Sequence, residues 1–184
     1  LTWLFSHLQA KYNLEAIEAG FYASAPLIFG AFGNWFSGFL IDFIYKKKKL
    51  ELSRRAPAII GFVLASVGIL ASIYMEEINM AIICISIGVF GADMTLSPSW
   101  TTCLDVGKHF SGAVSGTMNM AGNIGSFLTA LAFPYLLDFT GSEVPFFYLA
   151  AELNGIAIFL WTGIKPQQAL QITQLSRYDN KRRF

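Results

Sequence analysis

The sequence predicts an all-α polytopic membrane protein, and three observations support this fold class. Of the 184 residues, 54% are hydrophobic and only 14% are charged, whereas an average soluble domain carries about 25% charged residues. The apolar residues come in blocks of about 20 or more, the length that crosses ~30 Å of hydrocarbon. These runs are also continuous, unlike the short alternating strands of a membrane β-barrel. The membrane span is therefore the structural unit of this chain.

Five complete spans are expected along the chain. They cover residues 17–45, 56–75, 78–104, 110–137 and 144–164. The apolar stretch before them is too short to cross a bilayer, so residues 1–14 are expected to hold the end of a truncated span and an outer loop. Residues 15–165 would form a five-span membrane bundle, and residues 166–184 a polar tail.

The basic residues are confined to alternate connections between the spans. Two loops and the tail hold 12 of the 13 Lys and Arg residues: 46–55, 105–109 and the residues from Lys165 onward. Cytoplasmic segments of membrane proteins carry such an excess of cations. We therefore expect a multi-pass protein of the cell membrane with its carboxyl terminus in the cytoplasm. The net charge of +1 gives no indication of a nucleic-acid partner.

The end of the span at 17–45 resembles a loop signature of the major facilitator superfamily. The signature reads Gly-x-x-x-Asp-Arg-x-x-Arg-Arg, and its glycine, acid and last two cations match Gly38, Asp42, Lys46 and Lys47. The match is partial, because Phe43 replaces the first Arg. A glycine near a helix end allows close helix approach, and an acid beside cations can contact a neighbouring helix end and hold one gate state. A capping Asp beside topology-setting lysines would explain the same residues.

A longer match covers residues 92–125. Its matching positions include Asp93, Ser97, Pro98, Trp100, Asp105, Gly112, Gly116, Asn119, Gly122, Asn123 and Gly125. Of these, Asp105 is counted with the gate and loop-motif candidates. The pattern resembles the tenth and eleventh spans of the anion:cation symporter branch of the superfamily, which moves organic anions such as hexuronates, related sugar acids and phosphate. The resemblance extends to about Lys165. It implies a six-helix half of a major facilitator fold, spans seven to twelve with the first truncated, whose partner is a missing amino-terminal six-helix half.

Asp93 lies 15 residues into the span at 78–104, close to the expected bilayer midplane. An ionised carboxylate at that depth is costly unless it is hydrated, paired or protonated. Helical periodicity places Ser97 and Trp100 on the same stripe, and Pro98 can open the backbone beside them by removing a helical hydrogen bond. Asp93 is thus a candidate proton-coupling carboxyl group. A buried structural acid bonded to the backbone or to a neighbouring helix is the alternative.

Three amides are candidates for contact with a substrate or gate. Asn119 and Asn123 lie one turn apart on a small-residue stripe of the span at 110–137, and Asn34 lies on a similar stripe of the span at 17–45. An amide can both donate to and accept from a sugar hydroxyl or a carboxylate. The same stripes could instead be tight helix contacts.

The remaining observations narrow the function. No Lys or Arg lies inside a predicted span, so the cation that an anionic substrate needs would belong to the missing half. Glu152, in the last predicted span, is expected to be a structural or solvated carboxylate. Metalloprotease, phosphate-loop and nucleophile-elbow motifs are absent from the sequence, so neither an enzyme nor a cofactor is expected.

The function that we expect is secondary active transport of an organic anion, a sugar acid or similar carboxylate. Transport would occur by ion-coupled symport with alternating access, with H+ preferred over Na+ as the coupling ion. Besides the missing half, the partners would be the small anionic substrate and the lipid bilayer. A non-transporting membrane sensor or interaction protein with the same fold is the alternative.

Overall fold

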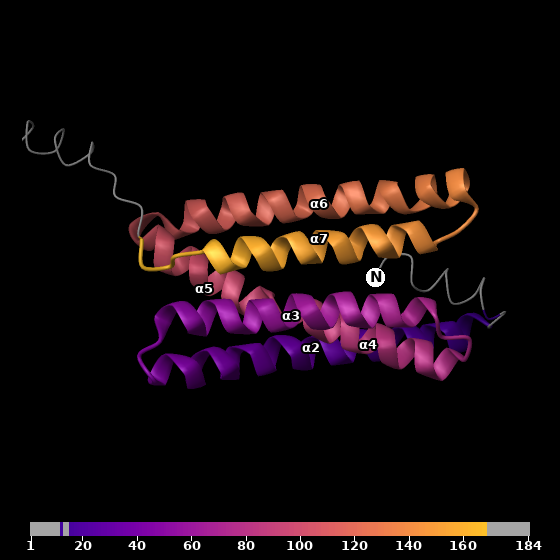
Figure 1. Ribbon diagram of the computed structural model, residues 1–184, viewed down its shortest axis with the longest axis horizontal. Helices are drawn as coiled ribbons and strands as arrows, with labels where there is room; N and C mark the ends of the chain where they lie inside the picture. The colour runs from indigo at the N-terminus through magenta and orange to yellow at the C-terminus, as the bar shows by residue number, and fades with distance from the viewer. Residues whose placement is uncertain (1–11, 13–14, 169–184) are drawn as a thin grey trace, which may run out of the picture.

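The computed structural model describes Tyr12 and residues 15–168. In this part of the chain every regular element is helical (Figure 1): α2 Ala16–Lys46, α3 Leu50–Ile73, α4 Ile78–Met94, α5 Leu96–Gly107, the 3-10 helix η1 Lys108–Phe110, α6 Ser111–Thr140 and α7 Val144–Gly163. The predicted all-α fold is confirmed. The predicted truncated span and most of the predicted tail lie outside the described residues.

Four segments of the described chain are long and apolar enough to cross a membrane: Ala16–Lys46, Leu50–Ile73, Ile78–Thr140 and Val144–Gly163. The third contains 63 residues and would measure ~95 Å as one straight helix, about three times the hydrocarbon thickness. It makes two passes instead, because α6 turns back beside α5 after η1 (Figure 1). The chain is therefore a multi-pass membrane protein.

Two predicted loops are shorter in the structure than the sequence suggested. The loop expected at 46–55 shrinks to residues 47–49, because α2 continues to Lys46 and α3 begins at Leu50. The segment 105–109, expected to be a loop, is also helical, since α5 continues through Gly107 and η1 follows. Helical hydrogen bonds satisfy backbone groups that a loop would leave to water. As a result, two arginines lie inside α3, and the expectation that no Lys or Arg lies within a span is wrong.

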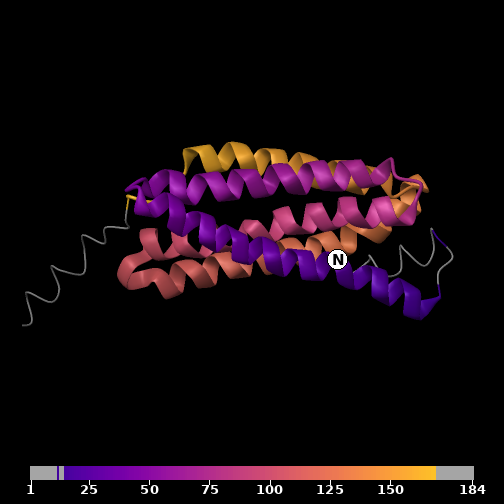
Figure 2. The ribbon, with the colours of Figure 1, turned by 90° about the horizontal axis from the view of Figure 1, so that it is seen from below.

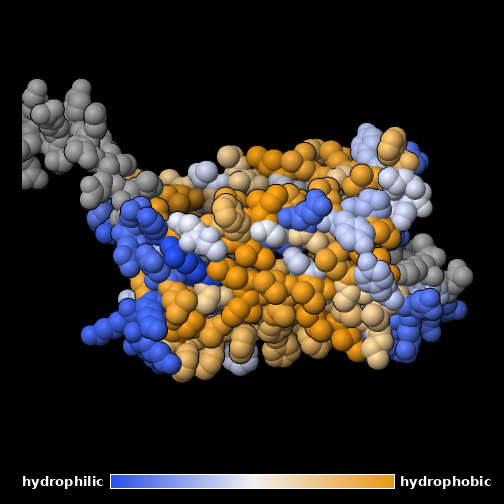
Figure 3. Space-filling view, viewed as in Figure 1, coloured by the Kyte–Doolittle hydropathy of each residue, from blue (hydrophilic) through white to orange (hydrophobic). Residues whose placement is uncertain are grey.

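Most of the hydrophilic surface lies at the two ends of the bundle, with an apolar band between them (Figure 3). We call one the basic end; it carries the α2–α3 and α5–α6 connections and the end of α7. The other, the acidic end, carries the α3–α4 and α6–α7 turns with Glu76, Glu77 and Glu143. This distribution matches a helical bundle whose middle faces lipid or another apolar surface.

The helices α2, α3 and α4 interlock through backbone contacts at glycines. A Cβ at Gly33 of α2 would collide with the backbone carbonyl of Phe90 in α4. A Cβ at Gly91 would lie 2.5 Å from the carbonyl oxygen of Gly61 in α3. Backbone atoms cannot rotate out of the way as a side chain can, so only glycine permits this close approach. The contacts fix how α4 is seated between its two neighbours.

The helix α6 is packed much less tightly than α4. Within the described chain it mainly contacts α5 and α7, and Phe133 is the only one of its residues classed as buried. The ring of Phe133 meets Phe146 of α7 edge to face at 5.0 Å. Figure 2 shows α3 and α7 along one side of the bundle and α5 and α6 along the other. The candidate polar residues lie on α2, α4, α5 and α6.

Candidate functional site

The span predicted at 78–104 is kinked and not one continuous helix. Its first part, α4, ends at Met94 and its second part, α5, begins at Leu96. Thr95 between them keeps right-handed helical torsion angles, φ −78° and ψ −15°. Pro98 has no N–H to donate to the carbonyl four residues earlier. The Ser99 hydroxyl donates to the Thr95 carbonyl at 2.7 Å, a type of bond that bends helices.

Asp93 lies at the centre of this kinked span, 15 residues after Ile78 and 14 residues before Gly107. Its carboxylate occupies the space beside Gly30 of α2, where an added Cβ would collide with Oδ2. The side chain is half-buried, and among the described residues it makes no hydrogen bond or ion pair. At this depth an unpaired carboxyl group has a low free-energy cost only when it is protonated or hydrated. Such a group is suited to taking up a proton or accepting a ligand.

Two predicted site residues meet one turn further along. The Ser97 hydroxyl lies 2.6 Å from Asn34 Oδ1 and 3.2 Å from the Asn34 carbonyl oxygen. Within the described chain the Asn34 amide nitrogen has no partner, so it can donate to a bound ligand. Trp100 follows Ser97 by three residues on α5, and its side chain is 45% exposed. The structure thus gathers an acid, a hydroxyl, an amide and an indole ring where α2 meets α4 and α5.

The other two predicted amides do not join this group. Asn119 and Asn123 are exposed on α6, and Asn123 Nδ2 donates to the Asn119 carbonyl of its own helix at 3.0 Å. In the described part of the chain no hydrogen bond links either amide to Asp93 or Asn34. The glycines of this stripe have open space around them, so the stripe is not a helix contact within the described residues. The candidate residues therefore fall into two groups, one where α2 meets α4 and α5 and one on α6.

The residues of the loop signature spread over the basic end. Asp42 and Lys46 are exposed, and the described chain offers neither of them an ion pair. Lys47 places its ammonium group 4.5 Å from the ring centre of Phe43, a cation–π distance. Phe43 stands where the family signature has Arg, so this position contributes an aromatic face in place of a charge.

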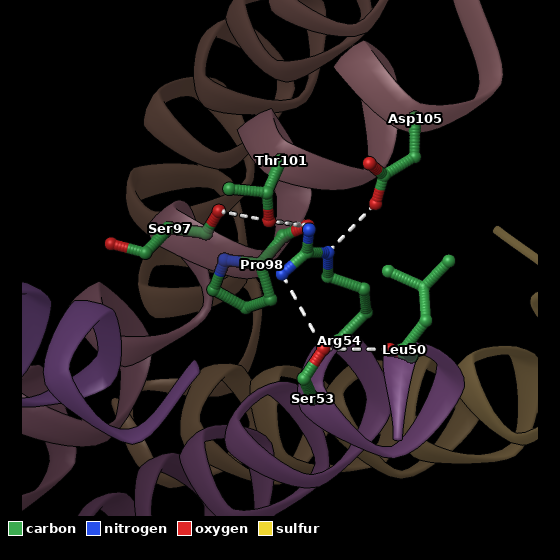
Figure 4. A network of polar contacts seen from close by, with 7 residues as sticks. All are labelled: Leu50, Ser53, Arg54, Ser97, Pro98, Thr101 and Asp105. Atoms are coloured by element: carbon green, nitrogen blue, oxygen red, sulfur yellow. Dashed lines mark hydrogen bonds and ion pairs between the residues drawn. The ribbon is translucent and has the colours of Figure 1, made fainter. Parts of the chain in front are cut away.

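An ion pair at the basic end links α3 to α5 (Figure 4). Arg54 Nε lies 2.7 Å from Asp105 Oδ2, and the side chains are 10% and 24% exposed. The guanidinium group also reaches the Ser53 hydroxyl at 3.4 Å and the face of Tyr45 at 5.6 Å. The sequence placed Asp105 in the gate motif but left Arg54 in a loop. The apolar residues Leu50 and Leu52 before it were the signal that the helix had already begun.

Ser37 is a polar residue of this region that the sequence analysis missed. Its side chain is fully buried between α2 and α4, and its hydroxyl donates to the Met94 carbonyl at 2.6 Å. Close helix approach was expected at the neighbouring Gly38, but a Cβ there would meet Ser97 Oγ only at an ordinary 4.0 Å. Among the described residues the tight backbone contact of α2 lies instead at Gly33, on its buried face. Ser37 shares this face four residues later.

These features define an integral membrane protein with a discontinuous span that carries a midplane acid, a class in which such spans line substrate pathways. The chain belongs to the Major Facilitator Superfamily, whose family model matches residues 1–130. The predicted family is thereby confirmed, and its members are transporters and not enzymes. The assignment to the anion:cation symporter branch stays a prediction.

Several curated proteins are similar over most of the chain. The probable sulfoacetate transporter SauU of Cupriavidus necator is 27% identical over 90% of this chain and 39% of its own length. The probable galactarate/D-glucarate transporter GudP of Bacillus subtilis is 30% identical over 77% of this chain and 31% of its own. The uncharacterized transporter YybO of Bacillus subtilis is 31% identical over 82% of this chain and 35% of its own. The chain thus spans about a third of the length of these relatives.

Proposed function

We propose that this chain is the carboxyl-terminal half of a secondary active transporter that moves an organic anion, a sugar acid or similar carboxylate, by ion-coupled symport. The observation that carries the proposal is the position of Asp93, an acid without a partner among the described residues at the centre of a kinked span. The hydrogen-bonded pair of Asn34 and Ser97 lies one turn away. Relatives named as sulfoacetate and galactarate/D-glucarate transporters support an anionic substrate.

In this proposal Asp93 takes up and releases the coupling ion. A single carboxyl group suits H+, because protonation removes the charge that is costly at this depth, whereas a cation such as Na+ calls for several oxygen ligands. Asn34 and Ser97 would bind polar groups of the substrate, and Trp100 would form an apolar wall. Asn119 and Asn123 would add a second set of amide contacts from α6.

The proposed cycle needs a second six-helix half, packed against the side of the bundle formed by α2, α5 and α6. The open glycine stripe of α6 supports a partner on this side. That half would supply the cation that binds the anionic substrate, and rocking of the two halves would give alternating access. In a cell membrane the basic end would face the cytoplasm, where Asp42, Lys46, Lys47 and the Arg54–Asp105 pair would hold one gate state.

The proposal is tested by replacing Asp93 in the full-length transporter reconstituted in vesicles. Asp93→Asn keeps shape and hydrogen bonding but cannot release a proton. We expect it to retain galactarate binding or exchange and to lose accumulation driven by an imposed pH gradient. Glu152→Gln, the same change at an exposed acid of α7, is the matched control and should leave accumulation intact.

Each outcome of this experiment is informative. Accumulation that survives Asp93→Asn with unchanged pH dependence would show that coupling lies elsewhere. Loss of folded protein in this variant alone would make Asp93 a structural acid. Binding of galactarate by the unaltered protein without any uptake would favour a sensor.

A further inference from the structure

The carbonyl group of Met94 sits at the kink and lacks its usual donor. In an uninterrupted helix this carbonyl accepts a hydrogen bond from the N–H four residues later. That residue is Pro98, which has no N–H. Met94 is fully buried, so water cannot easily replace the lost donor. A buried carbonyl without any hydrogen bond is destabilising, and the fold must supply a substitute.

The substitute comes from another helix. The Ser37 hydroxyl of α2 donates to the Met94 carbonyl at 2.6 Å, and Ser37 is itself 0% exposed. The helix α3 also packs against the kink: a Cβ at Gly61 would lie 3.1 Å from Met94 Cβ and 3.0 Å from Thr95 Cγ2. The kink is therefore held between a hydrogen bond from α2 and a tight contact with α3.

The same bond fixes the register between α2 and the kinked span. Along α2, Gly30, Asn34 and Ser37 are spaced by four and three residues, so they share one face of the helix. They meet, in turn, the carboxylate of Asp93, the hydroxyl of Ser97 and the carbonyl of Met94. The acid and the hydroxyl lie on either side of the residue that Ser37 holds.

We propose that Ser37 is a positioning residue, whose hydroxyl replaces the N–H that Pro98 lacks and thereby holds Asp93 and Ser97 against α2. The two residues act as a pair: Pro98 removes the backbone donor to the Met94 carbonyl, and the Ser37 hydroxyl supplies a new donor. The role of Asp93 and Ser97 in transport rests on the proposed function. The pairing of Ser37 with Pro98 does not, so it can be tested without a transport assay.

The test measures how fast a disulfide forms between cysteines at positions 34 and 97, whose present side chains are in contact. The full-length protein carries Asn34→Cys and Ser97→Cys, with its native cysteines replaced by alanine. Ser37→Ala removes the hydroxyl, Pro98→Ala restores an N–H for the Met94 carbonyl, and the double variant has both changes. Ser24→Ala is the matched control, because that hydroxyl lies on the same helix and donates to the carbonyl of Phe21 in its own helix at 2.6 Å.

We expect Ser37→Ala to slow disulfide formation by about 5-fold or more, the effect of leaving a buried carbonyl unsatisfied. Ser37→Thr, which keeps a hydroxyl, should restore the rate, and Ser24→Ala should not change it. In the Pro98→Ala background, Ser37→Ala should alter the rate less than about 2-fold, because the helix then supplies its own donor. In transport assays Ser37→Ala should shift the pH profile of uptake.

The proposal would be overturned if Ser37→Ala leaves the rate of disulfide formation unchanged. It would also be overturned if Ser37→Ala slows that rate equally in the Pro98 and the Pro98→Ala backgrounds. If Ser37→Ala yields no folded protein, the double variant decides: recovery of folded protein supports the pairing and continued loss contradicts it. If the unaltered protein does not transport at all, the proposed function fails, while the disulfide rates still decide the role of Ser37.

Discussion

The helices α4 and α6 are both rich in glycine, yet they use it in opposite ways. In α4 the backbone at Gly91 contacts α3, and α2 contacts the backbone of Phe90 through Gly33. In α6, a Cβ added at Gly112, Gly116, Gly122 or Gly125 would meet no atom of the described chain within 4 Å, apart from the helix's own neighbouring backbone. The two sequences look alike as stripes of small residues, but only the first stripe has a partner in the described chain.

The difference separates a structural region from an exposed one. Where glycine meets backbone, substitution must disturb the fold. Where glycine faces open space, an added methyl group collides with nothing in the described bundle, so substitution cannot disturb its packing. The polar residues divide in the same way, because Asn34 and Ser97 bond across helices while Asn123 bonds within its own. The following substitutions test this division from the largest expected effect to the smallest.

The largest effect is expected at the ion pair that fastens α5 to α3. Arg54→Ala leaves the Asp105 carboxylate largely buried without its cation, and breaking a buried pair costs about 3–5 kcal/mol of folding free energy. Thermal unfolding in detergent should show a strongly destabilised protein. Lys108→Ala, at an exposed lysine of the same end, should have almost no effect. Equal stability of the two variants would mean that the pair does not hold the packed region together.

The second effect contrasts the two kinds of glycine directly. Gly91→Ala forces a Cβ toward the Gly61 carbonyl and the Ala65 nitrogen, 2.5 and 2.6 Å away, and overpacking of this kind costs about 1–3 kcal/mol. Gly122→Ala adds the same methyl group in open space and should stabilise the helix by about 0.5–1 kcal/mol. Opposite shifts of the unfolding temperature are the expected result. A loss of stability in Gly122→Ala would show that its stripe is packed after all.

A smaller effect is expected from the hydrogen bond between Asn34 and Ser97. Each single alanine substitution should cost about 0.5–1.5 kcal/mol, the net value of one such bond. The double substitution should cost little more than one of them, since the bond can be lost only once. Unfolding of all four proteins in detergent measures this coupling. Strict additivity would indicate that the two side chains do not interact.

The smallest effect is expected at Asn119. Its side chain is exposed on α6, so Asn119→Ala should change the folding free energy of the bundle by less than about 0.5 kcal/mol. In the full-length transporter the same variant should weaken uptake of galactarate by raising the concentration needed for half-maximal rate. Unaltered uptake would remove Asn119 from the proposed site.

The helical class and the positions of the spans could be predicted because hydrophobic length is a property of the sequence alone. The central position of Asp93 could be predicted in the same way, from the number of residues between the start of its span and the acid. The basic loops were drawn too long, because every charged residue near a span end was assigned to a loop, whereas Arg54 lies inside α3 with its charge paired to Asp105. Arg54 was misplaced for this reason.

The contacts between helices could not be predicted in the same way. Pro98 shows that one carbonyl loses its donor, but the sequence does not say that Ser37, about 60 residues earlier, supplies the replacement. The pairing of Asn34 with Ser97 likewise depends on the rotation of two helices about their axes. Whether the stripe of α6 is packed depends on what lies beside it, which its own residues cannot reveal.

The glycine contacts among α2, α3 and α4 also have a mechanical consequence. Side chains between helices act as compliant spacers, because their torsion angles can adjust when the helices shift. Backbone atoms in direct contact have no such freedom, and close-packed interiors transmit displacement with little loss. These three helices would therefore respond to a force as one stiff block. Bending would concentrate in α5, beyond the kink, and in α6, where the described residues make no such contact.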